Sequence, residues 1–167
     1  NDYRIGTGFL TPPFILPVLT DYGFTDTAFR LALNRKRPGW LYEVEKGATT
    51  IWENWNGLDE NNVPRDSFNH YSFGTITGWL FSRVAGVTPL EPGFRRIRIR
   101  PTPGGGLTWV KCRYESAAGM IWTSWRIEEG EFRLQVDVPV DTLVEMPDGT
   151  AQTVPAGIHG FSARVEG

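Results

Sequence analysis

Residues 94–101 read Phe94-Arg-Arg-Ile-Arg-Ile-Arg-Pro101, and the character of the chain changes here. Apolar and basic side chains alternate along the stretch, which is typical of a strand with one buried face. Comparable runs follow at 107–114, 120–127, 132–138, 142–145 and 160–165. Short strands repeated about every ten residues and separated by Gly and Pro turns predict an antiparallel β-sandwich. We assign it to 88–167, with Thr88–Gly93 as a linker.

The preceding residues, 1–87, are predicted to be helical. Four helices are expected, at about 11–22, 25–34, 40–46 and 71–85. Pro12 and Pro13 suit a helix start and Gly23 suits a helix end. In the last helix Ile76, Trp79, Leu80 and Val84 keep a helical period. Four helices joined by long loops bury little surface together, so 1–87 is expected to be the end of a larger helical array.

Composition excludes several classes of protein. A net charge of -2 argues against a nucleic-acid or anionic-membrane partner. The chain has no apolar run near the roughly 20 residues that a membrane span needs. The single Cys112 excludes an internal disulfide and a multi-cysteine zinc site, and is expected to be buried in a strand. The chain starts Asn1-Asp2-Tyr3 without an initiator Met; we therefore expect a fragment, and its compartment stays open.

The stretch Gly47–Trp55, GATTIWENW, carries the strongest chemical candidate. Glu53 lies between Trp52 and Trp55, and a partly dry aromatic setting tends to raise the pKa of an acid, as general acid–base catalysis requires. The spacing from Thr50 to Glu53 fits a helix capping box equally well. Glycosidic hydrolysis takes two carboxylates. The possible second acids lie in stretches that also suit a solvated surface: Glu43, Glu45, Asp59, Glu60 and Asp66.

The second candidate is His70, where a loop enters the last predicted helix with Asn69 as its expected cap. A histidine in this position is more often a structural hydrogen bonder than a catalyst. His159, the other histidine, is expected on a surface turn. With two distant histidines and one cysteine, no metal site is predicted, and no cofactor motif is present.

Four ordered blocks resemble one known family. They are TGFLTPP (7–13), GATTIWENW (47–55), SFNHYSFGTITGWLFSRVAGV (67–87) and PGFRRIRIRP (92–101). Together they resemble the C-terminal region of the inverting bacterial α-L-rhamnosidases of glycoside hydrolase family 78. Beyond Pro101 the likeness is looser, at Glu115–Trp125.

The resemblance implies a fold, an activity and a site. It implies that 1–87 are the last helices of an (α/α)6 barrel and 88–167 a β-sandwich. Rhamnose-containing glycosides would be the substrates, hydrolysed with inversion. Glu53 would be the general base, and His70 would contact the sugar. Trp52 and Trp55 would line or support its pocket. The general acid would lie upstream, so the isolated chain is expected to be inactive and, with open helices, to self-associate.

An alternative concerns the β half alone. It could be a carbohydrate-binding module in which Trp109, Trp122 or Trp125 stacks on glycans, or a purely structural cap. Packing of these rings between the two sheets is the simpler explanation.

Overall fold

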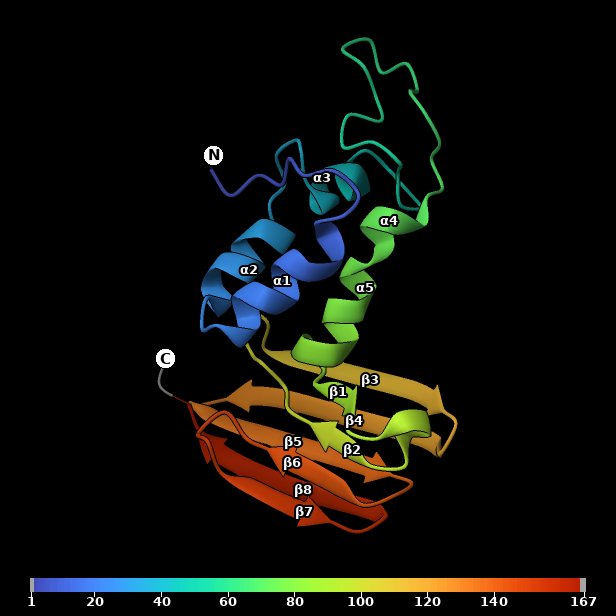
Figure 1. Ribbon diagram of the computed structural model, residues 1–167. Helices are drawn as coiled ribbons and strands as arrows, with labels where there is room; N and C mark the ends of the chain where they lie inside the picture. Colours follow the sequence, from blue (N-terminus) through green and yellow to red (C-terminus); the bar gives the residue numbers. More distant parts are fainter. Residues whose placement is uncertain (1, 166–167) are drawn as a thin grey trace. The chain divides into compact units, whose positions relative to one another are not determined.

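The computed structural model describes residues 2–165 and separates the chain into two compact units, Asn1–Trp79 and Leu80–Gly167 (Figure 1). The first unit is helical and the second holds the β-sheets. The expected α+β class is therefore confirmed. The domain boundary between residues 87 and 88 stays a prediction.

Helices form in the first unit where the sequence predicts them. They are α1 (Pro12–Asp21), α2 (Thr25–Ala32), α3 (Trp40–Glu45), α4 (Tyr71–Gly74) and α5 (Ile76–Trp79). Gly23 ends the α1 region in the left-handed conformation (φ 85°) that glycine adopts without strain. Phe29 and Ala32 bury one face of α2 as expected, whereas Leu33 lies outside the helix and is 38% exposed.

The long helix predicted over 71–85 is wrong as a single α-helix. It is divided into α4, α5 and a π-helical turn, η1 (Leu80–Val84), in the second unit. The Thr75 hydroxyl donates to the carbonyl of Ser72 (2.8 Å), which competes with regular helix bonds at the first break. The Ala85 N–H donates to the carbonyl five residues back, Leu80 (2.8 Å), which widens the last turn. The hydrophobic period cannot distinguish these turns from a continuous helix.

The second unit contains two four-stranded sheets within the described residues. One has the order β3 (Trp109–Ser116), β4 (Gly119–Glu128), β5 (Glu131–Val138), β8 (Gly157–Arg164), all antiparallel. The other has the order β1 (Val87–Pro89), β2 (Ile97–Ile99), β6 (Thr142–Glu145), β7 (Ala151–Val154). The pair β2–β6 is parallel, so the expected all-antiparallel pattern holds for the other pairs only.

Two strands were missed and one is shorter than predicted. β1 lies in the expected linker and β7 has three exposed residues out of four, so neither shows a clear alternation. The stretch 94–101 forms β2 only from Ile97, because Pro92–Phe94 make a 3-10 turn (η2). Its alternation is nevertheless real: Ile97 and Ile99 are fully buried, while Arg98 and Arg100 lie within 3.9 Å of Glu145.

The sandwich core follows the two-residue period of its strands. β5 buries Phe132, Leu134, Val136 and Val138 and exposes the residues between them. Trp125 of β4 is 1% exposed, and its Nε1 donates to the carbonyl of Val84 (2.8 Å).

Two sequence predictions concern single side chains of this unit. Cys112 is a free, buried thiol as predicted, and burial raises its pKa. His159, expected on a turn, lies instead in β8, half-buried, with Nε2 2.9 Å from the carbonyl oxygen of Pro155. Across residues 2–165 there is no helix with the length and apolarity needed to span a bilayer.

Candidate functional site

Two backbone segments of the helical unit, 50–53 and 67–70, lie side by side and place the two predicted site residues. The His70 N–H donates to the carbonyl of Ile51 (2.9 Å), and the Glu53 N–H donates to the carbonyl of Ser67 (2.9 Å). The Thr50 hydroxyl also donates to the carbonyl of Phe68. No helix begins at Thr50, so the capping-box interpretation of Glu53 is wrong. Both candidates lie outside regular helices and strands, His70 on extended backbone and Glu53 in a bend.

Glu53 is half-buried and its carboxylate is oriented by one backbone donor. Oε2 accepts the N–H of Ser67 at 3.1 Å. This is a bond that a purely structural acid also makes. A carboxylate has about four lone-pair sites, so a single bond leaves capacity to accept a proton from water. The structural and chemical roles are therefore compatible.

The two tryptophans beside Glu53 are packed into the interior. Trp52 is 2% exposed and stacks on Phe68, with ring centroids 4.7 Å apart. A Cβ on Gly57 would lie 2.6 Å from the Trp52 ring, so only glycine fits there. Trp55 is 7% exposed and stacks on Phe73 at 3.7 Å. Both rings anchor the chain around Glu53 and present little surface of their own.

His70 caps α4, the position that the sequence assigned to Asn69. Its Nδ1 accepts the N–H of Ser72 at 3.2 Å. An accepting Nδ1 in a neutral imidazole leaves the proton on Nε2, which is then a donor. The imidazole stacks on Phe9 (ring centroids 4.9 Å apart) and on Tyr71 (5.0 Å), which are 45% and 83% exposed. A hydrogen-bond donor beside exposed aromatic rings suits a sugar.

Glu43 is the residue whose environment differs most from the expected solvated surface. It is 1% exposed, and its Oε2 accepts the N–H of Trp52 at 3.2 Å. Burial raises the pKa of Glu43 to about 7, against the lowering effect of that hydrogen bond. Trp40 and Glu43 are three residues apart and so share one face of the helix, but a helix of six residues does not show in its sequence which face is buried.

The other acids considered are on the surface or in the loop. Glu45 forms an ion pair with Arg35 (2.5 Å), and Asp66 accepts from Asn54 (3.0 Å). Asp59 accepts the N–H groups of Asn61 and Val63, both at 2.8 Å. Glu60 is exposed. In the part of the chain that the structure describes, no three His, Cys, Asp or Glu side chains gather as metal ligands would.

Comparison with family models covers almost the whole chain. Residues 1–84 match the bacterial α-L-rhamnosidase six-hairpin glycosidase domain, and residues 86–159 match the bacterial α-L-rhamnosidase C-terminal domain.

Known proteins give the same result. An α-L-rhamnosidase of Streptomyces avermitilis is 38% identical over 99% of this chain, and one of Formosa agariphila is 33% identical over 96%. The chain spans 17% and 18% of their lengths.

Solved structures agree. The crystal structure of the S. avermitilis α-L-rhamnosidase complexed with L-rhamnose matches with a TM-score of 0.92 and 34% identity, over 98% of this chain and 18% of that one. The α-L-rhamnosidase of Aspergillus terreus matches with a TM-score of 0.94 and 34% identity, over 98% and 20%. The expected order, helices of a barrel and then a β-sandwich, is confirmed. The chain belongs to the bacterial α-L-rhamnosidase family, with residues of its six-hairpin glycosidase domain followed by its C-terminal domain.

Proposed function

We propose that this chain is part of an α-L-rhamnosidase that removes terminal α-L-rhamnose from glycosides with inversion, and that Glu53 is its general base. The observation that carries the proposal is the paired arrangement of segments 50–53 and 67–70, which holds Glu53 next to the strand of backbone that presents His70. The relatives at 38% and 33% identity are α-L-rhamnosidases, which supports the substrate class.

In the proposed mechanism Glu53 takes a proton from the water that attacks the anomeric carbon. The Ser67 N–H fixes Oε2 of Glu53. The carboxylate therefore keeps a constant orientation, and its remaining lone pairs can accept the proton of that water. The general acid lies on a barrel helix upstream of this chain. Inversion requires the two carboxyl groups to be roughly 6.5–9.5 Å apart, with the water between.

His70 and its neighbours bind the sugar in this proposal. Nε2–H donates to a rhamnose hydroxyl, while the exposed faces of Phe9 and Tyr71 cover the apolar C–H face of the ring. Trp52 and Trp55 support the sugar site by holding the backbone on both sides of Glu53.

The test uses the longer protein that contains this segment, with an aryl α-L-rhamnoside as substrate. Glu53→Gln is expected to lower kcat roughly 10²–10⁴-fold, the usual value of a general base. Glu45→Gln is the matched control, since that acid is ion-paired on the surface. NMR of the first product formed should show the β anomer. A fully active Glu53→Gln variant would show that Glu53 is not the general base, and an initial α anomer would exclude inversion.

A chain of residues 1–167 alone is expected to show no hydrolysis, because the general acid is proposed to lie upstream. Cleavage of the same aryl rhamnoside by this chain would place both carboxyl groups within it.

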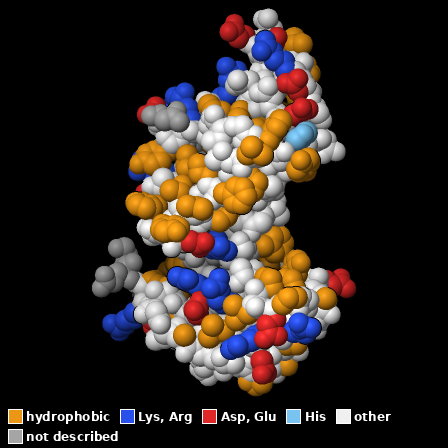
Figure 2. Space-filling view, viewed as in Figure 1, with side chains coloured by type: hydrophobic (Ala, Val, Ile, Leu, Met, Phe, Trp, Pro, Cys, Tyr) orange, Lys and Arg blue, Asp and Glu red, His pale blue; other side chains and the backbone are white. Residues whose placement is uncertain are grey.

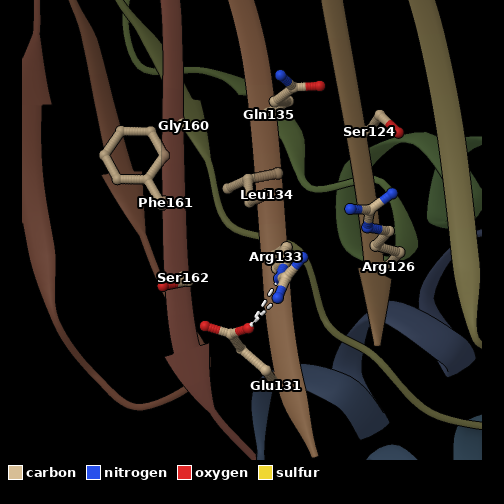
Figure 3. Close-up of a pocket in the computed structure, with 9 residues that line it drawn as sticks. All are labelled: Ser124, Arg126, Glu131, Arg133, Leu134, Gln135, Gly160, Phe161 and Ser162. Carbon is tan, nitrogen blue, oxygen red and sulfur yellow. Dashed lines mark hydrogen bonds and ion pairs between the residues drawn. The ribbon is translucent and has the colours of Figure 1, made fainter. Parts of the chain in front are cut away.

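A second candidate function is glycan binding by the β-sandwich. Figure 3 shows a hollow on the outer face of β4, β5 and β8. It is lined by Ser124, Arg126, Glu131, Arg133, Leu134, Gln135, Gly160, Phe161 and Ser162. Nothing lies within 4 Å of the position that a Cβ on Gly160 would occupy, so the hollow stays open there. Amide, hydroxyl and guanidinium groups are suitable partners for sugar hydroxyls.

The three candidate tryptophans of the sandwich differ in exposure. Trp109 is 62% exposed and pairs with Arg126 across β3 and β4, on the face of the hollow. Trp122 is partly exposed on the same face, because it lies two residues from Ser124. Trp125 is buried and serves packing. This function is tested by titrating the protein with oligosaccharides and monitoring Trp fluorescence. Saturable binding that is lost in Trp109→Ala but kept in Glu53→Gln would support glycan binding by the sandwich. Absence of binding would contradict it.

A further inference from the structure

Glu43 is a buried carboxyl group for which the proposed mechanism has no use. Oε2 is bonded to the Trp52 N–H, whereas Oε1 is enclosed by protein and has no hydrogen-bond partner among the described residues. A carboxyl group enclosed in this way is unfavourable, since burial penalises its charge and leaves one oxygen unsatisfied. Its position therefore requires an explanation other than stability.

The backbone that Glu43 holds belongs to the residue directly before Glu53. Three consecutive residues there are fixed by different partners. Ile51 accepts from the backbone of His70, Trp52 donates to Glu43, and Glu53 donates to the backbone of Ser67. The Glu43 contact is the one made by a side chain, and Glu43 lies nine residues before Trp52 in the sequence, whereas His70 and Ser67 lie after it.

The short helix α3 supports both flanks of Glu53. Glu43 holds the Trp52 N–H, and Trp40 meets the Trp55 ring edge-on with centroids 5.2 Å apart. Trp40 is itself fixed, because its Nε1 donates to the carbonyl of Phe73 (2.9 Å). One face of α3 thus contacts the segment 52–55 on both sides of Glu53.

We propose that Glu43 is a positioning residue for the reaction: its carboxyl group fixes the Trp52 backbone and thereby the place of the Glu53 carboxylate. This inference rests on the proposed role of Glu53. Without an acceptor the buried Trp52 N–H would have to move to find a partner. A displacement of about 1 Å at a reacting group can lower a rate roughly 10²-fold.

Two substitutions distinguish the role of Glu43 as a hydrogen-bond acceptor from its role in filling space. Glu43→Met keeps an unbranched side chain of similar length but removes the acceptor. Glu43→Gln keeps a carbonyl oxygen for the Trp52 N–H and removes the ionisation. Glu45→Met, on the exposed side of the same helix, is the control. All are made in the longer protein containing this segment, at a temperature well below unfolding, and assayed with an aryl α-L-rhamnoside.

Glu43→Met is expected to lower kcat roughly 10²-fold with KM changed less than about threefold, and Glu43→Gln to restore kcat to within about threefold of the parent. In a Glu53→Gln background, Glu43→Met should cause no further loss, because the group that it positions is already gone. A general loss of folded protein would instead lower the measured activity by the same factor in the parent and in the Glu53→Gln background.

Three results would overturn the inference: an unchanged kcat in Glu43→Met, the same loss in the Glu53→Gln background, or a folded Glu43→Gln variant as impaired as Glu43→Met. If Glu43→Met does not fold, the kcat of Glu43→Gln alone tests the inference. A loss of kcat above about tenfold in that variant would then overturn it. A fully active Glu53→Gln variant instead removes the proposed function itself, so the two failures are distinguishable.

Discussion

The helical unit and the β unit hold their structures by different means. In the β unit, backbone ladders align the strands, and alternate side chains enter the core, as in β5. In the helical unit, indole N–H groups fix separate segments: Trp40 to Phe73, Trp55 to Thr7, and Trp79 to Thr20. Single side chains thus do in one unit what a ladder does in the other. The candidate site lies in the unit where side-chain bonds join separate segments, so its geometry depends on individual residues.

The two units also differ in their exposed apolar side chains. Along α1 and its ends Leu10, Phe14, Val18 and Tyr22 recur every four residues and are 87%, 65%, 49% and 75% exposed. Phe14 and Val18 are four residues apart and lie on one side of α1; together with Leu10 and Tyr22 at its ends we call them the apolar ridge of α1. Figure 2 shows many apolar side chains on the helical unit. In the β unit the large exposed side chains, such as Ile158, are not arranged in this way.

The largest expected effect breaks the β unit. Trp125→Ala should destabilise it by about 3–5 kcal/mol, because it removes a fully buried indole and the bond to Val84. Trp109→Ala, at a 62% exposed ring, is the control and should change stability by less than about 0.5 kcal/mol. Amide hydrogen exchange in β4 and β5 measures the stability change in each of the two variants. Equal protection in the two variants would show that ladders alone hold the sheet.

The second prediction concerns the apolar ridge of α1. The chain of residues 1–167 is expected to self-associate, since contiguous apolar patches on a surface tend to be interaction sites. Replacing Phe14 by Ser should weaken association roughly 10–100-fold, given about 1.5–3 kcal/mol for burying such a side chain. Ile158→Ser, at a 73% exposed site of the β unit, should have no effect. Sedimentation velocity measures this, and a monomer at every concentration would contradict the prediction.

The same contrast explains which parts of the fold the sequence could predict. The two-residue period of β4 and β5 directly reflects burial, so these strands are found within one residue of their predicted ends. β7 was missed because three of its four residues are exposed. The helix over 71–85 was predicted as continuous because its hydrophobic period does not register the competing Thr75 hydroxyl.

The sequence was sufficient to identify the residues of the candidate site, but not to predict their geometry. The motif located Glu53 and His70, but the pairing of segments 50–53 and 67–70 depends on backbone bonds across a loop, which no local pattern specifies. Glu43 appeared to be a surface acid because a six-residue helix is too short to show which face is buried. Its burial is a tertiary property.

The third prediction uses the ionisation of Glu43. Its folded pKa, about 7, is above the usual 4.5, so the folded state retains a proton that the unfolded state releases. Stability should therefore fall as pH rises from 4.5 to 7, by on the order of 3 kcal/mol, and then level off. Glu43→Gln should remove this slope, whereas Glu45→Gln should keep it. Urea unfolding at several pH values tests the prediction, and parallel curves for the parent and Glu43→Gln would contradict it.

The smallest expected effect separates the two roles of His70. As the cap of α4 it accepts the Ser72 N–H, and His70→Ala should lower stability by about 1 kcal/mol. Asn is a good cap residue, so His70→Asn should keep most of that stability. An Asn side chain is shorter and lacks the imidazole Nε2–H, so KM for an aryl rhamnoside should rise in both variants of the longer protein. If His70→Asn retained the parent KM, the histidine would be a cap alone, and the helical unit would use this side chain, like its indoles, only to hold backbone in place.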